Sequence, residues 1–343
     1  MKKIIGLIFI FSLTFSLNAQ TNLTSKDSIN IFYDSLFSTL KSDYLHKDEV
    51  NWTSIENETR SSLKKFSDFK SALSQTTILF DKIKGTHCQL FYKDSVFTAT
   101  TKQPTENDFS EQWIKKYVTN PSFEVKVIDK NYGYILIPSL NFEDISSENI
   151  HKIAQPMYDQ ITDVKTKNKL KGWVIDLRFT TGGNIYPVLL ALYDLLGDNI
   201  VFGGLDVNKK LTDSVKLDNG KYLNNGKIIS YITPKGKKND KSKVVILTGI
   251  MTASLGEITA ISYKKKKNTL FIGEPTYGFT TGNDKRDLPF GAHMAMTVSY
   301  DCDRNGKFYD KIMPDILLSK QDNFDNLLLD KNIMEAIKWM NKK

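Results

Sequence analysis

The chain has 343 residues, 40% of them hydrophobic, and a net charge of +8. This length is enough to bury a large core and exceeds the usual size of a single domain, so we expect two structural units. The positive charge is spread over many loops, and its densest runs, Lys235–Lys243 and Lys264–Lys267, contain no interleaved aromatic residues. We therefore expect solvated faces and no nucleic-acid partner.

Residues 1–19 have the three-part layout of a secretory signal peptide. Lys2 and Lys3 precede an apolar run from Ile4 to Leu17, and Ala19 supplies a small residue before Gln20. The run is shorter than the roughly 20 residues that cross a membrane. We expect export without stable membrane insertion, to the periplasm or as a secreted protein.

A small helical domain is expected over residues 20–100, because apolar residues recur at helical intervals between Ser25 and Phe80. A polar linker containing Pro104 is expected over residues 101–124. Residues 125–343 then alternate short β-rich runs with helical segments, which predicts an α/β core. Nearly continuous apolar strands, such as Gly172–Leu177 and Val244–Leu247, indicate that both faces of its sheet are covered.

Two glycine-bearing loops follow predicted strands, where backbone amides can be held rigidly at a site. The first, Asp176–Asn184, contains the pair Gly182 and Gly183, although an ordinary strand-to-helix turn would look the same. The second, Thr248–Glu257, places Ser254 among small residues just before a helix. Such a serine could be a nucleophile beside amides that stabilise an oxyanion, or a simple helix cap.

Together these segments resemble the family of C-terminal-processing, or tail-specific, serine peptidases and their tricorn relatives. The resemblance spans about Tyr132 to Leu318 and rests on four motifs in the family's order, namely Asp-Leu-Arg with Gly182-Gly183, Thr252-Ala253-Ser254-x-x-Glu257, Gly273-Glu274-Pro275-Thr276-Tyr277-Gly278, and Pro314-Asp315-Ile316. It implies a crotonase-like peptidase core, Ser254 as nucleophile, and an oxyanion hole made by the amides of Leu255 and the Gly182-Gly183 loop. Glu257 and Arg178 complete motifs and are expected to be structural anchors.

One departure from this family concerns the general base. Tail-specific members place a lysine directly after the glycine that ends the third motif, but here Phe279 follows Gly278. A serine needs a base, and phenylalanine cannot accept a proton. The tricorn-like branch takes a histidine from an earlier segment, which matches His87, and Thr86 could orient it. The alternative is that His87 is only structural.

Other polar residues have weaker patterns. His46 and His151 are expected on the surface, His293 could approach the site, and no carboxylate partner for the base can be chosen among Asp301, Asp303 and Asp310. The Asp301-x-Asp303-x-Asn305-Gly306 run imitates a calcium loop but lacks the closing glutamate, so we interpret it as a hairpin turn.

Cys88 and Cys302 could form a disulfide or remain separate buried thiols. We expect no metal and no cofactor.

The sequence therefore predicts an exported serine peptidase that acts on a peptide or protein substrate by acyl-enzyme chemistry, with Ser254 as nucleophile and His87 as base. The alternative is an inactive peptide- or lipophile-binding protein on the same scaffold, for which Phe279 is the main support. If His87 is the base, activity should fall as the pH drops through the ordinary histidine range near 6.5.

Cleavage after Ala19 should leave Gln20 as the first residue of the exported protein, because the small residue lies at the cleavage end of the apolar run. Intact-mass spectrometry of the exported protein measures this. A species that retains Met1 would contradict the prediction.

Overall fold

The structure, a computed structural model, describes residues 23–342. The expected signal peptide lies outside the described residues. Between residues 23 and 342, no helix has both the length and the apolar character that crossing a membrane requires.

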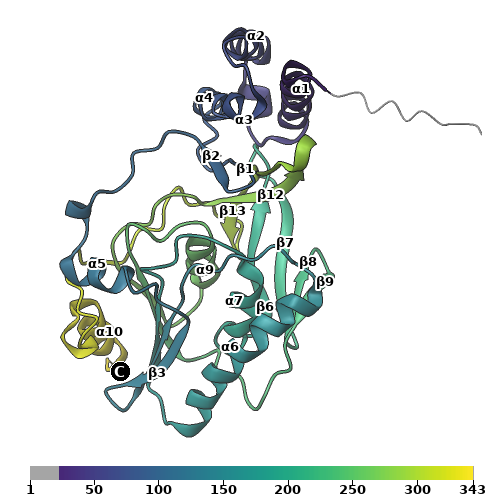
Figure 1. The fold of residues 1–343 in the computed structure, drawn as a ribbon. Coiled ribbons are helices and arrows are strands. Elements are labelled where there is room, and N and C mark those ends of the chain that lie inside the picture. The colour runs from purple at the N-terminus through teal and green to yellow at the C-terminus, as the bar shows by residue number, and fades with distance from the viewer. Residues whose placement is uncertain (1–22, 343) are drawn as a thin grey trace, which may run out of the picture.

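The first part of the described chain is helical, as expected, and its helices gather at one end of the molecule (Figure 1). They are α1 (Ser25–Asp43), the 3-10 turn η1 (Lys47–Glu49), α2 (Trp52–Leu63), α3 (Phe69–Ala72) and α4 (Gln75–Lys82). Thr24 caps α1 reciprocally with Asp27, which satisfies amides at the start of the helix. The apolar side of α1, including Phe32, Leu36 and Leu40, is buried against the other helices.

The next residues form strands and join an eight-stranded sheet, although residues 20–100 were expected to be helical. This sheet has the order β2-β1-β13-β6-β7-β8-β9, with β12 also paired to β13. Its strands are β1 (Gln89–Tyr92), β2 (Ser95–Thr98), β6 (Asn199–Leu205), β7 (Leu211–Asp218), β8 (Lys221–Asn224), β9 (Lys227–Tyr231), β12 (Thr281–Asp287) and β13 (His293–Asp303).

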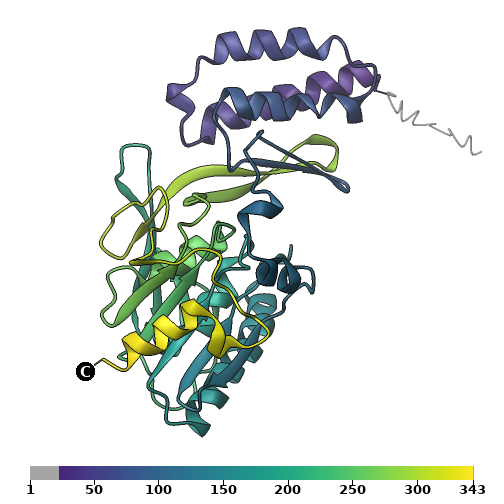
Figure 2. The same ribbon diagram turned by 90° about the vertical axis from the view of Figure 1, so that its left-hand side faces the viewer.

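The β12–β13 hairpin completes the core of the helical part, and Figure 2 shows it lying directly beneath the helices. Leu288, Met294 and Met296 of this hairpin region are buried in the same apolar cluster as α1 and α4. The Leu45 N–H also donates to the Thr297 carbonyl at 3.0 Å. The helices alone leave apolar surface exposed, and burying that surface against the hairpin supplies the missing half of their core.

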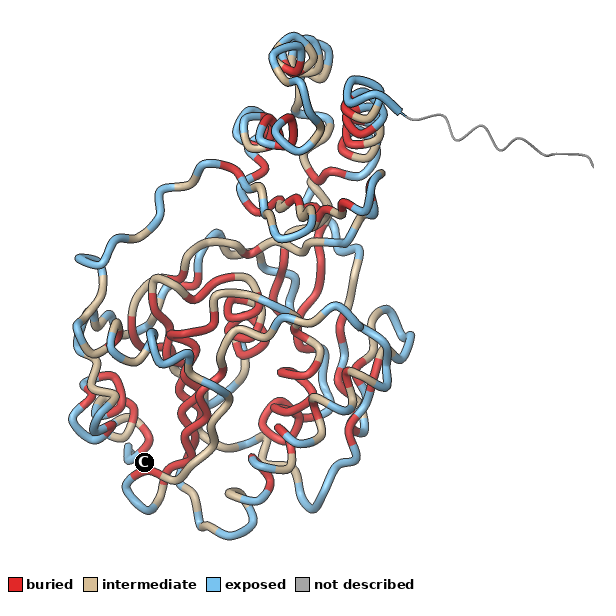
Figure 3. The backbone as a smooth tube through the Cα atoms, in the orientation of Figure 1, coloured by how far each residue is buried: buried red, intermediate tan, exposed pale blue. Residues whose placement is uncertain are grey.

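The second sheet has six strands in the order β14-β11-β10-β5-β4-β3, parallel except for the β3–β4 pair. Its strands are β3 (Glu124–Ile128), β4 (Tyr132–Leu136), β5 (Gly172–Asp176), β10 (Lys243–Thr248), β11 (Thr269–Gly273) and β14 (Ile316–Leu317). Successive side chains of β5 point to opposite faces, so Trp173 and Val174 enter two different apolar clusters. The expectation of a sheet covered on both faces is confirmed, and Figure 3 shows its central strands as buried.

Helices cover the two faces of this second sheet. The remaining helices are α5 (Glu111–Tyr117), α6 (Ser147–Lys167), α7 (Ile185–Ala191), α8 (Tyr193–Leu196), α9 (Leu255–Tyr263) and α10 (Lys331–Met340), with 3-10 turns η2 (Glu106–Asp108), η3 (Pro289–Gly291) and η4 (Leu327–Leu329). α6, α7 and α9 pack on one face, whereas α5 and α10 pack on the other. The α/β class is as expected, and the stretch 101–124 is more than a connection because α5 buries Trp113.

Gly133 in β4 lies where only a glycine fits, because a β-carbon there would be 2.2 Å from Cε3 of the buried Trp173. Gly133→Ala should lower the free energy of unfolding by about 1–3 kcal/mol through overpacking. Urea denaturation measures the change. Gly249→Ala is the control, since its added carbon would meet Arg178 Cγ at an ordinary 3.5 Å. Equal stabilities of the two variants would contradict the packing argument.

Candidate active site

Ser254 lies between strand β10 and helix α9, at the sharp turn that the sequence predicted. Its φ of 50° and ψ of −108° are unusual for a residue with a side chain. Backbone strain of this kind persists only where the surroundings impose it, and it often marks functional positions. The residue is half-buried, and Leu255 begins the helix, whose first amides have no acceptor within the helix.

The carboxylate of Glu257 fixes the backbone of this turn. Its Oε2 accepts the Ser254 N–H at 3.1 Å and the Phe279 N–H at 2.7 Å, and its Oε1 accepts the Gly278 N–H at 2.9 Å. The Thr276 hydroxyl also donates to Oε1, at 2.5 Å. Burial raises the pKa of Glu257 to about 7, against these four hydrogen bonds, which lower it. Glu257 is thus an anchor, as expected from the sequence.

The Gly182-Gly183 loop approaches Ser254 closely. A β-carbon built on Gly182 would lie 3.9 Å from the β-carbon of Ser254. Gly183 has a φ of 121°, and a β-carbon there would be 2.2 Å from the Leu140 carbonyl oxygen, so glycine is required. The Ala253 N–H donates to the Thr180 carbonyl at 3.0 Å, which joins the glycine loop to the serine turn. The structure therefore brings both glycine-bearing loops together.

His87 lies just before β1 and is buried. Its Nδ1 is 2.7 Å from the hydroxyl oxygen of Thr281, and its ring stacks on Phe279 with centroids 4.4 Å apart and planes at 18°. The Asn283 side chain donates to the His87 carbonyl at 2.7 Å. Burial lowers the pKa of His87 to about 4, and a hydrogen bond to the Thr281 backbone only partly opposes this. The imidazole is therefore neutral at neutral pH.

Phe279 connects the histidine to the serine turn. Its ring stacks on His87, while its backbone N–H shares the Glu257 oxygen that also accepts the Ser254 N–H. Segments that are far apart in the sequence, around His87, Ser254 and Phe279, thus meet at one place. The sequence missed Thr281 as the partner of the imidazole, and Thr86, the expected orienting residue, is exposed. A signal was available, since Thr281 is two residues beyond Phe279 and shares its side of an extended segment.

The other histidines lie in different surroundings. His46 is half-buried, and its Nε2 is 3.2 Å from the Tyr300 hydroxyl, whereas its Nδ1 is 3.1 Å from Glu49. His151, also half-buried, contacts the Tyr231 carbonyl. Both were expected on the surface. His293 pairs with Phe91 in the sheet and stacks on its ring with centroids 4.9 Å apart.

The carboxylates near the end of β13 differ in role. Asp303 accepts the N–H groups of Asn305 and Lys307, which supports the interpretation of this run as a turn. Asp301 is fully buried, and its Oδ2 has no hydrogen-bond partner within the described chain. Burial and the nearby charge of Glu257 raise the pKa of Asp301 to about 8. Asp301 is thus mainly neutral at pH 7.

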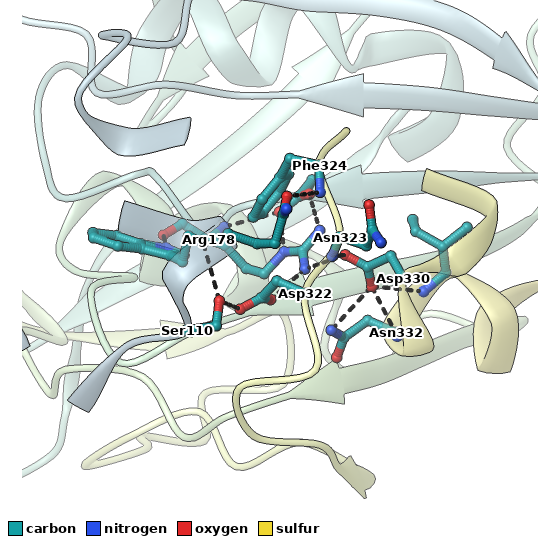
Figure 4. Close-up of polar contacts among 12 residues, drawn as sticks. Ser110, Arg178, Asp322, Asn323, Phe324, Asp330 and Asn332 are labelled. Atoms are coloured by element: carbon teal, nitrogen blue, oxygen red, sulfur yellow. Dashed lines mark hydrogen bonds and ion pairs between the residues drawn. The ribbon is translucent and has the colours of Figure 1, made fainter. Parts of the chain in front are cut away.

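Arg178 precedes the glycine loop, and Figure 4 shows its side chain among Asp322, Asp330 and Phe324. Its guanidinium donates to Asp176 at 2.6 Å, to Asp322 at 2.6 Å and to Asp330 at 2.8 Å, and lies 4.4 Å from the centre of the Phe324 ring. Burial opposes the charge on Arg178, but the carboxylates of Asp176 and Asp330 outweigh it and raise the pKa. These contacts fasten the end of β5 to the C-terminal segment, as expected of a structural anchor.

The structure shows the state of the two cysteines and the grouping of residues that could bind a metal ion. Cys88 and Cys302 are both buried free thiols, so the disulfide alternative is wrong. Within residues 23–342, no three His, Cys, Asp or Glu side chains gather where they could hold a metal ion.

The model of one protein family matches just over half of this chain. The model of peptidase family S41 matches residues 131–318. The nisin-resistance protein of Lactococcus lactis subsp. lactis is 29% identical over 213 residues, which cover 62% of this chain and 63% of that protein. The match therefore spans less than two thirds of that relative.

Solved structures share the fold over most of the chain. A lipoprotein from Streptococcus agalactiae has a TM-score of 0.68 at 19% identity, covering 93% of this chain and 96% of that chain. A peptidase-like protein from Parabacteroides merdae has a TM-score of 0.59 at 16% identity, covering 94% and 98%. The photosystem II D1 C-terminal processing protease has a TM-score of 0.51 at 16% identity, covering 87% and 94%. At these identities the likeness concerns the fold alone.

The raised pKa of Asp301 predicts a pH dependence of stability. The pKa of Asp301 is about 8 in the folded protein and near 3.8 in the unfolded chain, so folding is progressively destabilised as the pH rises from about 4 to about 8. Asp301→Asn, which cannot ionise, should be more stable than the wild type at pH 8 by on the order of a few kcal/mol, with a much smaller difference at pH 4. Urea denaturation at both pH values tests this. A difference that is the same at both would show that Asp301 is ionised when folded.

Proposed function

Because the chain belongs to peptidase family S41, whose model matches residues 131–318 of 343, we propose that it is a serine peptidase with Ser254 as nucleophile and His87 as general base. The observation that carries the proposal is the shared oxygen of Glu257. It accepts the N–H of Ser254 and the N–H of Phe279, the residue on which His87 stacks. The same buried carboxylate thus holds the backbone of the proposed nucleophile and the backbone of the residue that supports the proposed base.

His87 meets one requirement of a general base. A base must be unprotonated, and burial keeps the imidazole neutral above about pH 4. Its Nδ1 lies 2.7 Å from the Thr281 hydroxyl oxygen, and in the proposed mechanism Nδ1 carries the proton and donates it to that oxygen. The lone pair of Nε2 is then the one available to Ser254.

The proposed reaction is acyl transfer. Nε2 of His87 takes the proton of the Ser254 hydroxyl as Oγ attacks the peptide carbonyl. The N–H of Leu255 and one from the Gly182-Gly183 loop stabilise the oxyanion, and His87 then protonates the leaving amine. Water, activated by the same imidazole, hydrolyses the acyl-enzyme and regenerates Ser254.

The substrate is proposed to be a peptide or protein that the enzyme meets after export, in the periplasm or outside the cell. The sequence supports export through the layout of residues 1–19. One relative is named for nisin resistance, so nisin is a peptide to test alongside an unrelated protein such as casein. We include no metal or cofactor in the mechanism.

Removing the nucleophile should abolish reaction with a serine-directed fluorophosphonate, and removing the base should slow it strongly. We expect no labelling of Ser254→Ala and a loss of about a thousandfold or more in His87→Ala, because an unactivated hydroxyl is a weak nucleophile. His293→Ala is the control, since it removes another histidine that stacks on a phenylalanine and should label like the wild type. A wild-type protein that resists labelling and leaves peptides intact would favour the binding-protein alternative.

The pH dependence should follow the lowered pKa of His87. The fluorophosphonate labelling rate of the free enzyme should stay high at pH 6 and fall as the pH drops through about 4, because only the neutral imidazole accepts the serine proton. This replaces the midpoint near 6.5 that the sequence predicted, and the cause is burial of the ring. A measured midpoint near 6.5 would show that His87 is exposed to water in the free enzyme.

A further inference from the structure

The segment that follows the third motif presents alternate side chains to His87. Residues 279–281 lead into β12, and in an extended chain residues two apart point the same way. Phe279 stacks on the imidazole, and Thr281 lies at its Nδ1. The intervening Thr280 is buried on the other side, where its hydroxyl donates to the Asp310 carbonyl.

Neighbouring residues hold both the backbone and the ring of Phe279 in place. Its N–H donates to Glu257 at 2.7 Å, which fixes the backbone relative to Ser254. Its ring meets Tyr277 edge-to-face, with centroids 4.6 Å apart, and the Tyr277 hydroxyl is 3.2 Å from that of Thr101. A ring fixed in this way gives the imidazole a rigid apolar support on one face.

Thr281 fixes how the imidazole is rotated within the plane of its own ring. The 2.7 Å separation of its hydroxyl from Nδ1 sets the rotation of the ring. Thr281 thus occupies the place that a carboxylate takes in other serine peptidases, where the partner of Nδ1 selects the tautomer. Neither Asp301 nor Asp303 makes a hydrogen bond to His87 within the described chain.

We propose that Phe279 and Thr281 are positioning residues that together hold His87 as a neutral base, with Nδ1 protonated and Nε2 directed to Ser254. The proposal rests on the function proposed above. Phenylalanine at the lysine position is then part of the mechanism. A lysine there would place a second positive charge beside the imidazolium that forms during the reaction, whereas a phenyl ring supports the imidazole without charge.

The first test replaces Phe279, on which the His87 ring stacks. Phe279→Leu keeps an apolar side chain but removes the stacking surface, so the second-order rate of fluorophosphonate labelling should fall by about ten- to a hundredfold. The midpoint of its pH profile should also rise from about 4 toward the ordinary value near 6.5, because water gains access to the ring. Phe279→Trp keeps an aromatic face and should retain the low midpoint. The midpoint does not depend on how much of the protein is folded.

The second test removes the hydrogen bond at Nδ1. Thr281→Val has nearly the same shape without the hydroxyl and should label about tenfold or more slowly, because the ring can rotate away from Ser254. Thr281→Ser keeps the hydroxyl and should recover most of the rate. Recovery by serine distinguishes a positioning role from simple loss of packing.

Phe91→Leu is the matched control, because Phe91 stacks on His293 with planes at 9° in the same sheet. It should label at the wild-type rate with an unchanged midpoint. A Phe279→Leu protein that labels like the wild type, with its midpoint still near 4, would overturn this inference while leaving Ser254 and His87 in their roles. Labelling of Ser254→Ala would instead remove the proposed function itself.

Discussion

The carboxylate of Glu257 is the group on which the arrangement of the site depends. It is buried and gathers donors from two separate parts of the chain, the turn before α9 and the segment from Thr276 to Phe279. Each of these N–H groups would be unsatisfied without it, and leaving a buried donor without a partner costs about 1–3 kcal/mol. The strained backbone of Ser254 persists because this network over-determines it.

Arg178 performs the corresponding task for the glycine loop. Its guanidinium joins the end of β5 to Asp322 and Asp330, so the glycine loop starts from a strand that the C-terminal segment holds in place. A buried ion pair is weak support for stability, because desolvation offsets much of the attraction, but its geometry is specific. Together Glu257 and Arg178 set the positions of Ser254 and Gly182, whose β-carbons would be 3.9 Å apart.

The parts of the fold that could be predicted from the sequence are those with a local pattern of residues. β5 and β10 are continuous apolar runs, and the loops after them contain the glycines and the serine. The strands β7 to β9 were missed because polar and charged residues interrupt their apolar positions, and β1 because its partner β13 is about 200 residues away. Thr281 was missed although it lies two residues beyond Phe279, because its contact with His87 joins segments about 190 residues apart. The lowered pKa of His87 depends on burial, which no local pattern reveals.

The proposed base, His87, comes from a segment early in the sequence. The proposed chemistry therefore depends on how the helical part packs against the β12–β13 hairpin. His87 lies two residues before β1, whose register against β13 pairs Gln89 with Ala295. A slip of one residue would turn alternate side chains to the opposite face and carry His87 away from Phe279. The helices resist such a slip because they share an apolar core with the β12–β13 hairpin, and because Leu45 donates to Thr297 of β13. The helical part therefore acts on the site through strand register, although the proposed nucleophile lies in a different part of the fold.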